Sequence, residues 1–366
     1  MAADDFAILT GISVYPNPGY TRLDGPPNDL ELVRTWLTDP AGGAVPPERV
    51  IVLQTPLPFP NDVDPDIAPP LAEEFDRHFK KLLRERMKLG PQRVSGRLYL
   101  YFSGHGFCNR SQDKPSEAAL YAANATREAY EHIFGTHYAR IAKAWALFAE
   151  VVLVMDCCRD SEVARVPTPK PYRDSPDDDL AADVRVLSIY ATPKGGKAQE
   201  RPIAERGNKV HGLLTHGLFK LLDELPPSDD AKGIAATDLR RHLWEAWSAI
   251  TGADGAPRPE IILPSNGEIY FPAKNRGSAV DFLWSGDAPP GWRLTLRNDR
   301  LDDIARIALD GNGSPLLAPG GVISHTLVPQ RLTVRLPQGL YAFETSAPAP
   351  RSGNFKVDGS HASIQL

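Results

Sequence analysis

The sequence predicts a doubly wound α/β domain followed by a small all-β domain. In the first part, short apolar runs alternate with segments whose apolar residues recur at helical spacing, and the runs 98–102 and 151–155 end abruptly in polar, reactive residues. Beyond residue 277 only short alternating runs remain, separated by Gly, Pro and Asn. We therefore expect one domain over residues 1–275 and a β-sandwich domain over residues 277–366.

The first domain is expected to alternate strands, helices and proline-rich loops. The predicted strands are 6–14, 50–53, 98–102, 118–124, 151–155 and 184–191, and segment 261–271 closes the domain. The predicted helices are 30–37, 71–89, 138–148, 212–222 and 238–250. Asn28 or Asp29 is expected to cap the first helix. Right-handed crossovers between such elements put the strands in parallel.

The second domain shows no segment with helical periodicity. Its predicted strands are 279–284, 292–296, 304–309, 322–328, 332–336, 340–345, 355–357 and 364–366. We expect Trp284 and Trp292 to lie in the core of this sandwich rather than to form a ligand platform.

Composition excludes several classes of function. The 366 residues carry a net charge of −5, which favours neither nucleic acid nor a membrane surface as a partner. No apolar run reaches the length of a membrane span. The three cysteines form no disulfide framework, and the first residues lack the pattern of a signal peptide. These features predict a cytoplasmic protein.

The chemistry is expected where the two apolar runs end. In open α/β sheets, ligands bind beyond the carboxyl ends of the strands, and this places His105 and Cys158 at such a site. A cysteine there needs a base to become a thiolate, and histidine is the usual one. Gly104 and Gly106 leave the imidazole open to a substrate. Because successive side chains on a strand face opposite ways, only one of the two adjacent thiols, Cys157 and Cys158, should face the cleft.

The same residues also have structural and metal-binding interpretations. Cys158 could be an inert buried thiol, and Asp29 could serve as a helix cap with no role in substrate binding. A zinc site would draw on His105, Cys108, Cys157 and Cys158, but adjacent cysteines are poor partners for one tetrahedral site, so no metal is predicted.

Five motifs resemble those of the caspase and metacaspase family. Ser103-Gly104-His105-Gly106 is similar to the family's S-G-H-G, and residues 156–161 (DCCRDS) resemble the metacaspase motif D-C/S-C-H-S-G. Residues 23–29 (LDGPPND) resemble the L-x-G-x-x-N-D segment before the family's first helix. Residues 198–200 and 212–215 resemble its "AxE" and "G-x-F-T" landmarks. The resemblance covers about residues 5–272 and implies a caspase-like three-layer sandwich with a mostly parallel sheet.

Roles are implied by these matches. Cys158 would be the nucleophile and His105 its acid–base partner, with the backbone N–H groups of Gly106 and Cys158 stabilising the oxyanion. The enzyme would be a cysteine endopeptidase acting on a protein or peptide.

Specificity for Arg or Lys at P1, the residue before the cleaved bond, is a property of metacaspases. The matching S1 positions here are Asp29, Ser103 and Asp156. Two carboxylates below a cleft favour a cationic side chain, which agrees with that expectation. The Gln-Ala-Cys-x-Gly form that is typical of Asp-specific caspases is absent from the sequence.

Regulation is expected to follow the family's zymogen pattern, in which loops are cut or displaced by a partner protease or regulator. The loops 160–183 and 194–210 are the candidates. The possible processing sites within them are Arg165, Lys170, Arg173, Arg201 and Arg206. The chain has Arg159-Asp160 where metacaspases have His-Ser. Metacaspases are often activated by calcium through an Asp cluster that is not matched here, although Asp174, Asp177, Asp178 and Asp179 are available. We therefore predict no cofactor, with calcium activation as the open alternative.

A monomer with a role in a bacterial stress, defence or cell-death pathway is the family-level expectation. The alternative hypothesis is a catalytically silent caspase-like scaffold that binds a partner through its β-domain. A third is a self-processing cysteine hydrolase with one physiological target.

Overall fold

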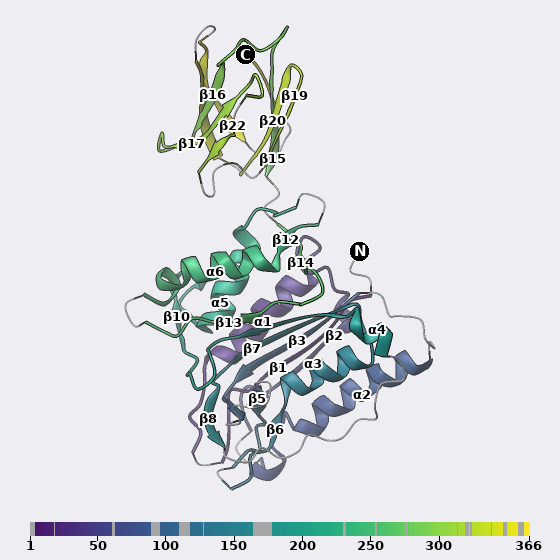
Figure 1. Cartoon of the computed structure of the whole chain (residues 1–366). Coiled ribbons are helices and arrows are strands. Elements are labelled where there is room, and N and C mark those ends of the chain that lie inside the picture. Colours follow the sequence, from purple (N-terminus) through teal and green to yellow (C-terminus); the bar gives the residue numbers. More distant parts are fainter. Residues whose placement is uncertain are drawn as a thin grey trace. The chain divides into compact units, whose positions relative to one another are not determined.

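Figure 1 shows the computed structural model, which describes residues 4–366 except for positions 18, 61–62, 89–95, 110–117, 127, 164–177, 230–231, 253–254, 275–276, 313, 319–321, 323, 338, 347–349 and 358–361. The chain divides into two compact units. Met1–Leu221 and Ala235–Phe271 form unit 1, and Leu222–Ile234 and Pro272–Leu366 form unit 2. Residues 222–234, which the sequence analysis assigned to the first domain, therefore group with the second unit.

A six-stranded, mostly parallel sheet forms the centre of unit 1. Its strand order is β13 (Glu260–Ile262), β9 (Arg185–Tyr190), β7 (Glu150–Cys157), β3 (Arg97–Gly104), β1 (Phe6–Gly11) and β2 (Val50–Gln54). Only β13 runs antiparallel to its neighbour. The middle strands β3 and β7 are buried after their first residue, because apolar side chains point to both faces.

Helices cover both faces of this sheet (Figure 1). The helices are α1 (Gly25–Thr38), α5 (Leu213–Glu224) and α6 (Ala236–Thr251) on one face, with α2 (Ala72–Lys88), α3 (Gly135–Ala144) and the short α4 (Asp178–Ala182) on the other. Trp36 of α1 packs edge-on against Phe219 of α5, with ring centroids 5.6 Å apart. On the other face, Phe75 of α2 lies 4.6 Å from Tyr138 of α3. The predicted three-layer α/β sandwich is confirmed.

Several short elements complete unit 1; β5 lies within the predicted strand 118–124, whereas most of the others lie where loops were predicted. The strands β4 (Gly106–Asn109), β5 (Ala118–Tyr121), β6 (His132–Ile133) and β8 (Asp160–Val163) form a small sheet in the order β6-β5-β4-β8. The strands β10 (Glu200–Ile203) and β11 (Lys209–Gly212) form a hairpin within the predicted loop 194–210. The remaining short elements are β12 (Ile234–Ala235), β14 (Tyr270–Phe271) and the 3₁₀ turns η1 (Pro47–Arg49), η2 (Pro65–Ile67) and η3 (Ala204–Arg206).

The first helix begins earlier than predicted, at Gly25. Pro26 and Pro27 occupy its first turn, where a missing N–H is harmless because no intrahelical partner exists there. The prediction that Asn28 or Asp29 caps the helix is therefore wrong, because both lie inside it and Asp29 is fully buried. Glu200 from β10 supplies the cap: its two carboxylate oxygens accept from the N–H groups of Asp24 and Gly25 at 3.0 Å each.

Unit 2 contains two sheets of mostly antiparallel strands. One has the order β19 (Ser324–Val328), β20 (Arg331–Leu336), β15 (Ser278–Leu283), β23 (Ala362–Gln365). The other has the order β18 (Leu316–Leu317), β17 (Asp303–Ala308), β16 (Arg293–Arg297), β21 (Gly339–Thr345), β22 (Ser352–Val357). Apolar side chains of both sheets share one core, as alternation predicted. Trp284 and Trp292 are buried in it with ring centroids 5.8 Å apart, so they are core residues.

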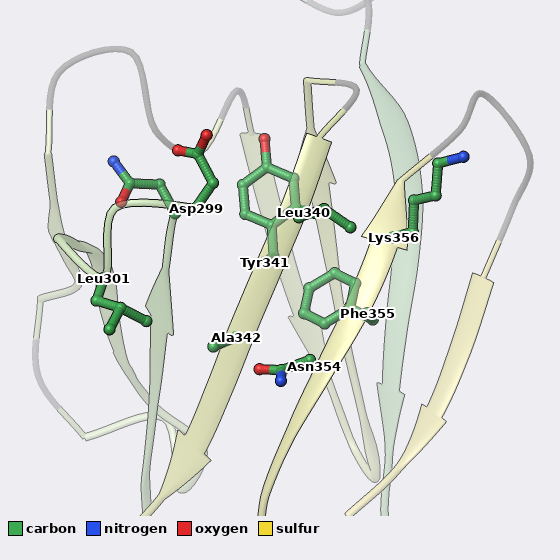
Figure 2. Close-up of a pocket in the computed structure, with 9 residues that line it drawn as sticks. Asp299, Leu301, Leu340, Tyr341, Ala342, Asn354, Phe355 and Lys356 are labelled. Carbon is green, nitrogen blue, oxygen red and sulfur yellow. The ribbon is translucent and has the colours of Figure 1, made fainter.

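A cavity of about 410 Å³ opens beside β21 and β22 in unit 2. Figure 2 shows Tyr341 and Phe355 side by side in this cavity, with Asp299 and Lys356 at its rim. The two rings stack with centroids 5.6 Å apart. Among the described residues, the lining contains neither His nor Cys, so this cavity offers no Cys–His pair.

Candidate active site

The strand register brings the two predicted reactive residues to one place. Gly104 of β3 lies opposite Cys157 of β7, and Ser103 lies opposite Asp156. His105 and Cys158 therefore leave neighbouring parallel strands at the same level of the sheet. Both line one small cavity of about 90 Å³. Its lining consists of Leu23, Pro26, Asp29, Ser103, Gly104, His105, Asp156, Cys158, Ala198, Gln199, Glu200 and Gly212.

His105 is oriented by its neighbours. Its Nε2 lies 2.8 Å from the carbonyl oxygen of Thr21, and its backbone N–H donates to the hydroxyl of Tyr15 at 2.9 Å. A carbonyl can only accept, so Nε2 carries the ring hydrogen and Nδ1 keeps the lone pair. Burial lowers the pKa of His105, which keeps the ring neutral at neutral pH and able to accept a proton.

Gly104 allows this arrangement. Its φ is +151°, and a Cβ atom there would lie 2.8 Å from the Tyr15 hydroxyl oxygen. A side chain at position 104 would therefore displace the hydroxyl that holds the backbone of His105.

The two adjacent thiols have different surroundings. Cys157 is 1% exposed, whereas Cys158 is partly exposed and lines the cavity, as strand alternation predicted. Burial raises the pKa of both thiols, so Cys158 rests as a thiol. Its Sγ lies 3.9 Å from the carbonyl oxygen of Ala198 as a weak donor. Within the part of the chain that the structure describes, Cys158 and His105 share a cavity but no direct hydrogen bond.

Asp29 is one of the predicted S1 residues, and it is a fully buried carboxylate with several donors. Ser103 Oγ donates to its Oδ2 at 3.0 Å, and the backbone N–H of Gly212 lies 3.2 Å from both oxygens. His211 Nδ1 lies 2.9 Å from Oδ1. Burial raises the pKa of Asp29, whereas the hydrogen bonds from Gly212 and Ser103 oppose that shift.

Asp156 is the second buried carboxylate of the cavity. Its Oδ2 accepts from the backbone N–H of Thr215 at 2.9 Å and from the Thr215 hydroxyl at 2.6 Å. Burial, with a smaller contribution from nearby Asp29, raises the pKa of Asp156 to about 7. Gly212 closes this part of the wall, since a Cβ there would lie 2.2 Å from Asp156 Oδ2.

Glu200 adds a third carboxylate that the sequence analysis did not assign to the site. It lines the cavity while it caps α1. The only sequence signal was its membership of the "AxE" landmark. Within the described part of the chain, the lining thus holds three acidic side chains and no Lys or Arg.

Arg159, which departs from the family motif, is buried and packs its guanidinium over the Tyr190 ring, 4.2 Å from the centroid. Nη1 donates to the carbonyl oxygen of Thr192 at 3.0 Å and forms an ion pair with Glu260 of β13. The Arg159 backbone also bonds to Gly195 and Gly196 at 2.8 and 3.0 Å. Arg159 therefore ties the loop after Cys158 to the edge of the central sheet.

Gly106, the other predicted oxyanion residue, begins β4 directly after His105. A Cβ atom at Gly106 would lie 2.6 Å from Cys157 Sγ, so the backbone packs tightly on the buried thiol. Its oxyanion role stays a prediction.

The predicted processing sites are in different settings. Arg165, Lys170 and Arg173 lie outside the described residues. Arg201 lies in the paired strand β10, and its guanidinium bonds to the carbonyl of Thr251 at the end of α6. A peptidase binds its substrate in an extended, unpaired conformation. The pairing of Arg201 in β10 therefore argues against it as a processing site. Arg206 ends η3 and precedes the exposed Gly207 in the β10–β11 hairpin.

Among the residues that the structure describes, no group of three or more His, Cys, Asp or Glu side chains is placed to hold a metal ion. Among the same residues, no helix has the length and apolar character that crossing a bilayer requires.

A His and a Cys at the ends of adjacent parallel strands, in a three-layer α/β sandwich, define the cysteine peptidase class of caspase type. The family model described as "Caspase domain" matches residues 4–243, and the chain belongs to that family of cysteine peptidases.

Three known proteins are similar to parts of the chain. A probable protease of a Desulfuromonadales bacterium is 27% identical over 233 residues, which is 59% of this chain but only about a quarter of that protein. Caspase-1 of Spodoptera frugiperda shares 11% identity with a TM-score of 0.48, over 74% of this chain and 91% of that one. Protein GSU0716 of Geobacter sulfurreducens shares 12% identity with a TM-score of 0.39, over 71% and 93%.

Proposed function

We propose that the protein is a cysteine endopeptidase that cleaves after Arg or Lys, with Cys158 as nucleophile and His105 as general base and acid. The observation that carries the specificity is the charge of the cavity. Asp29, Asp156 and Glu200 line it together with Cys158, and none of the described residues that line it is a Lys or Arg. Attraction between a P1 cation and these carboxylates is strengthened where water is excluded. An acidic P1 side chain would be repelled.

The chemistry follows from the tautomer of His105. Nε2–H stays bonded to the Thr21 carbonyl, so Nδ1 takes the proton of the Cys158 thiol as sulfur attacks the scissile carbonyl carbon. The oxyanion of the tetrahedral intermediate is stabilised by backbone N–H groups, for which Gly106 and Cys158 are the candidates. Nδ1 then gives its proton to the leaving amine as the C–N bond breaks. Water, deprotonated by Nδ1, hydrolyses the acyl-enzyme and restores the thiol.

The resting thiol supports a mechanism in which substrate binding triggers proton transfer. Burial raises the pKa of Cys158 and lowers that of His105, so both shifts disfavour the thiolate–imidazolium pair in the free enzyme. A bound substrate brings the carbonyl carbon that accepts the sulfur's electron pair. The proton therefore moves during attack rather than before it.

Regulation by cleavage is part of the proposal, and Arg206 is the site that we favour among the described residues. The hairpin that carries it pairs Glu200 with Gly212, and both residues line the cavity. A cut after Arg206 would release the hairpin end while leaving both strands attached to the sheet and helices. Such a cut changes the wall of the cavity without removing Asp29 or Asp156.

The decisive experiment uses four fluorogenic peptides that differ only at P1, with Arg, Lys, Asp or citrulline. We expect turnover of the Arg and Lys peptides, much less of citrulline, which keeps the shape of Arg without its charge, and none of Asp. The Cys158→Ala protein is the control for contaminating proteases. Absence of turnover by intact and by Arg206-cleaved protein would instead favour the silent scaffold. Intact mass of wild type against Cys158→Ala over time reports whether processing is autocatalytic.

A further inference from the structure

His211 lies directly behind the cavity, on β11, and is 3% exposed. It does not line the cavity itself. Its Nδ1 lies 2.9 Å from Oδ1 of Asp29, the carboxylate that the proposed function places in the S1 pocket. Because a charged carboxylate offers only acceptors, Nδ1 is the nitrogen that carries the hydrogen in this pair.

The groups that face His211 keep its ring neutral. Arg206 of η3 and Lys209 of its own strand are the cations that face it, whereas Asp29 of α1 and Asp156 of β7 are the opposing carboxyl groups. His216 of α5 also faces it, but the pKa of His216 is lowered to about 4, so that ring carries no charge at neutral pH. Burial first, and then Arg206 and Lys209, lower the pKa of His211 to about 4. At neutral pH the contact with Asp29 is therefore a hydrogen bond from a neutral donor and not an ion pair.

A neutral donor solves a specific physical problem at this position. A buried carboxylate without donors would take up a proton and lose its attraction for a substrate cation. A Lys or Arg partner would keep the carboxylate ionised but would cancel its charge toward the cavity. An imidazole N–H supports the ionised oxygen and leaves the net negative charge available.

We propose that His211 is the positioning residue for Asp29, holding its carboxylate charged and aimed at the cavity so that a cationic P1 side chain can bind. The inference rests on the proposed function, because it concerns the same pocket. His211 acts through Asp29 and touches neither the substrate nor the reacting atoms.

The test compares His211→Leu, which fills similar volume without a donor, with His211→Asn, whose Nδ2 can take the place of Nδ1. For the Arg peptide we expect His211→Leu to raise KM by about 10- to 100-fold, the effect of losing one buried hydrogen bond to a charged group, with kcat changed by less than about 3-fold. The acid limb of kcat/KM should move to higher pH, because Asp29 without this donor gains a proton more readily. His211→Asn should recover most of both effects.

Binding without catalysis separates this inference from the proposed function. The Cys158→Ala protein, with and without His211→Leu, is titrated with agmatine, a cationic mimic of the P1 side chain. Loss of agmatine binding on the His211→Leu change supports the role of His211 even where no peptide is cleaved. An active wild type whose KM and acid limb are unchanged by His211→Leu overturns the inference alone. A Cys158→Ala protein that binds no agmatine overturns it together with the basic specificity.

His211→Gln serves where His211→Leu lowers the yield of folded protein. Its amide lies one carbon further from the backbone than that of Asn, so it misplaces the donor while keeping a polar side chain. We expect His211→Gln to resemble His211→Leu in KM and in the acid limb. Equal recovery by Asn and Gln would contradict a requirement for a donor at the Nδ1 position.

Discussion

Gly104 on β3 lies opposite Cys157 on β7, each one residue before a reactive side chain. This single register places His105 and Cys158 side by side, although 53 residues separate them. A shift of one residue along either strand would turn Cys158 toward the core and Cys157 toward the cavity. The register of the strand pairing therefore determines which of the two thiols faces the cavity.

The two thiols should consequently respond differently to removal. Cys158→Ala is expected to lower kcat/KM for the Arg peptide by about 1,000-fold or more, because the nucleophile is lost. Cys157→Ala should keep activity within about 3-fold while lowering the free energy of unfolding by about 1–2 kcal/mol, since it removes only buried volume. Peptide kinetics and urea unfolding of both variants check this. An inactive but stably folded Cys157→Ala protein would reverse the assignment.

The acid limb of activity should be set by the carboxylates and not by His105. The pKa of Asp156 is raised to about 7, so this group is neutral below that pH and ionised above it. Attraction for a P1 cation is then lost as pH falls through about 7, with an apparent pKa that belongs to the Asp29–Asp156 pair. The pKa of His105 is lowered by burial, so its ring can still accept a proton there.

The pH profile of kcat/KM with the Arg peptide tests this, because it reports groups of the free enzyme. We expect the limb to sit near pH 7 and to appear mainly in KM. A profile that stays flat down to pH 5.5 would contradict a pocket that depends on these carboxylates.

Ionised Asp156 should also destabilise the fold. Its pKa is about 7 in the folded protein against 3.8 as the ordinary value, so between these pH values the folded state holds the extra proton. Stability therefore falls as pH rises through this window. Asp156→Asn cannot ionise, so it should raise the melting temperature more at pH 8 than at pH 5. The corresponding difference in the free energy of unfolding is up to about 3 kcal/mol. The exposed Asp66→Asn is the matched control, and an equal effect of both changes would refute the argument.

Glu200 should affect recognition and stability separately. Glu200→Gln removes the charge but keeps one oxygen for the helix cap, so we expect KM for the Arg peptide to rise about 10-fold with little loss of stability. Glu200→Ala should add a stability loss of about 1–2 kcal/mol, because the cap is gone. Glu205→Gln is the control, because Glu205 is an exposed carboxylate of η3 that does not line the cavity. Thermal melts beside the kinetics separate the two effects.

The fold was predictable to the extent that it depends on local patterns. The apolar runs predicted the strands of both units, and helical spacing predicted the helix 71–89, whose Phe75 and Phe79 are fully buried. Strand alternation predicted that only one of the two adjacent thiols faces the cavity, and the motif resemblance pointed to Cys158, which is the one that lines it. The start of α1 was missed because two prolines read as a loop, although they fit the first turn of a helix.

What the sequence could not give were the contacts between distant segments. The cap of α1 comes from Glu200, 176 positions after Asp24, and no local pattern in residues 15–30 points to it. His211 and Thr215 became visible only as hydrogen-bond partners of Asp29 and Asp156. Such partners are chosen by tertiary geometry, and many residue types satisfy the same sequence pattern.

The anchoring of Arg159 has a consequence for when the site can be completed during synthesis. Arg159 follows the nucleophile, but its ion-pair partner, Glu260, comes 101 residues later in the chain. A ribosome releases the N-terminal part first, so β3 and β7 can associate before β13 exists. The backbone bonds of Arg159 to Gly195 and Gly196 can form earlier, but the ion pair that fixes its guanidinium to the edge of the sheet forms only when nearly the whole of unit 1 has emerged. The loop after Cys158 is therefore among the last parts of unit 1 to become fully anchored.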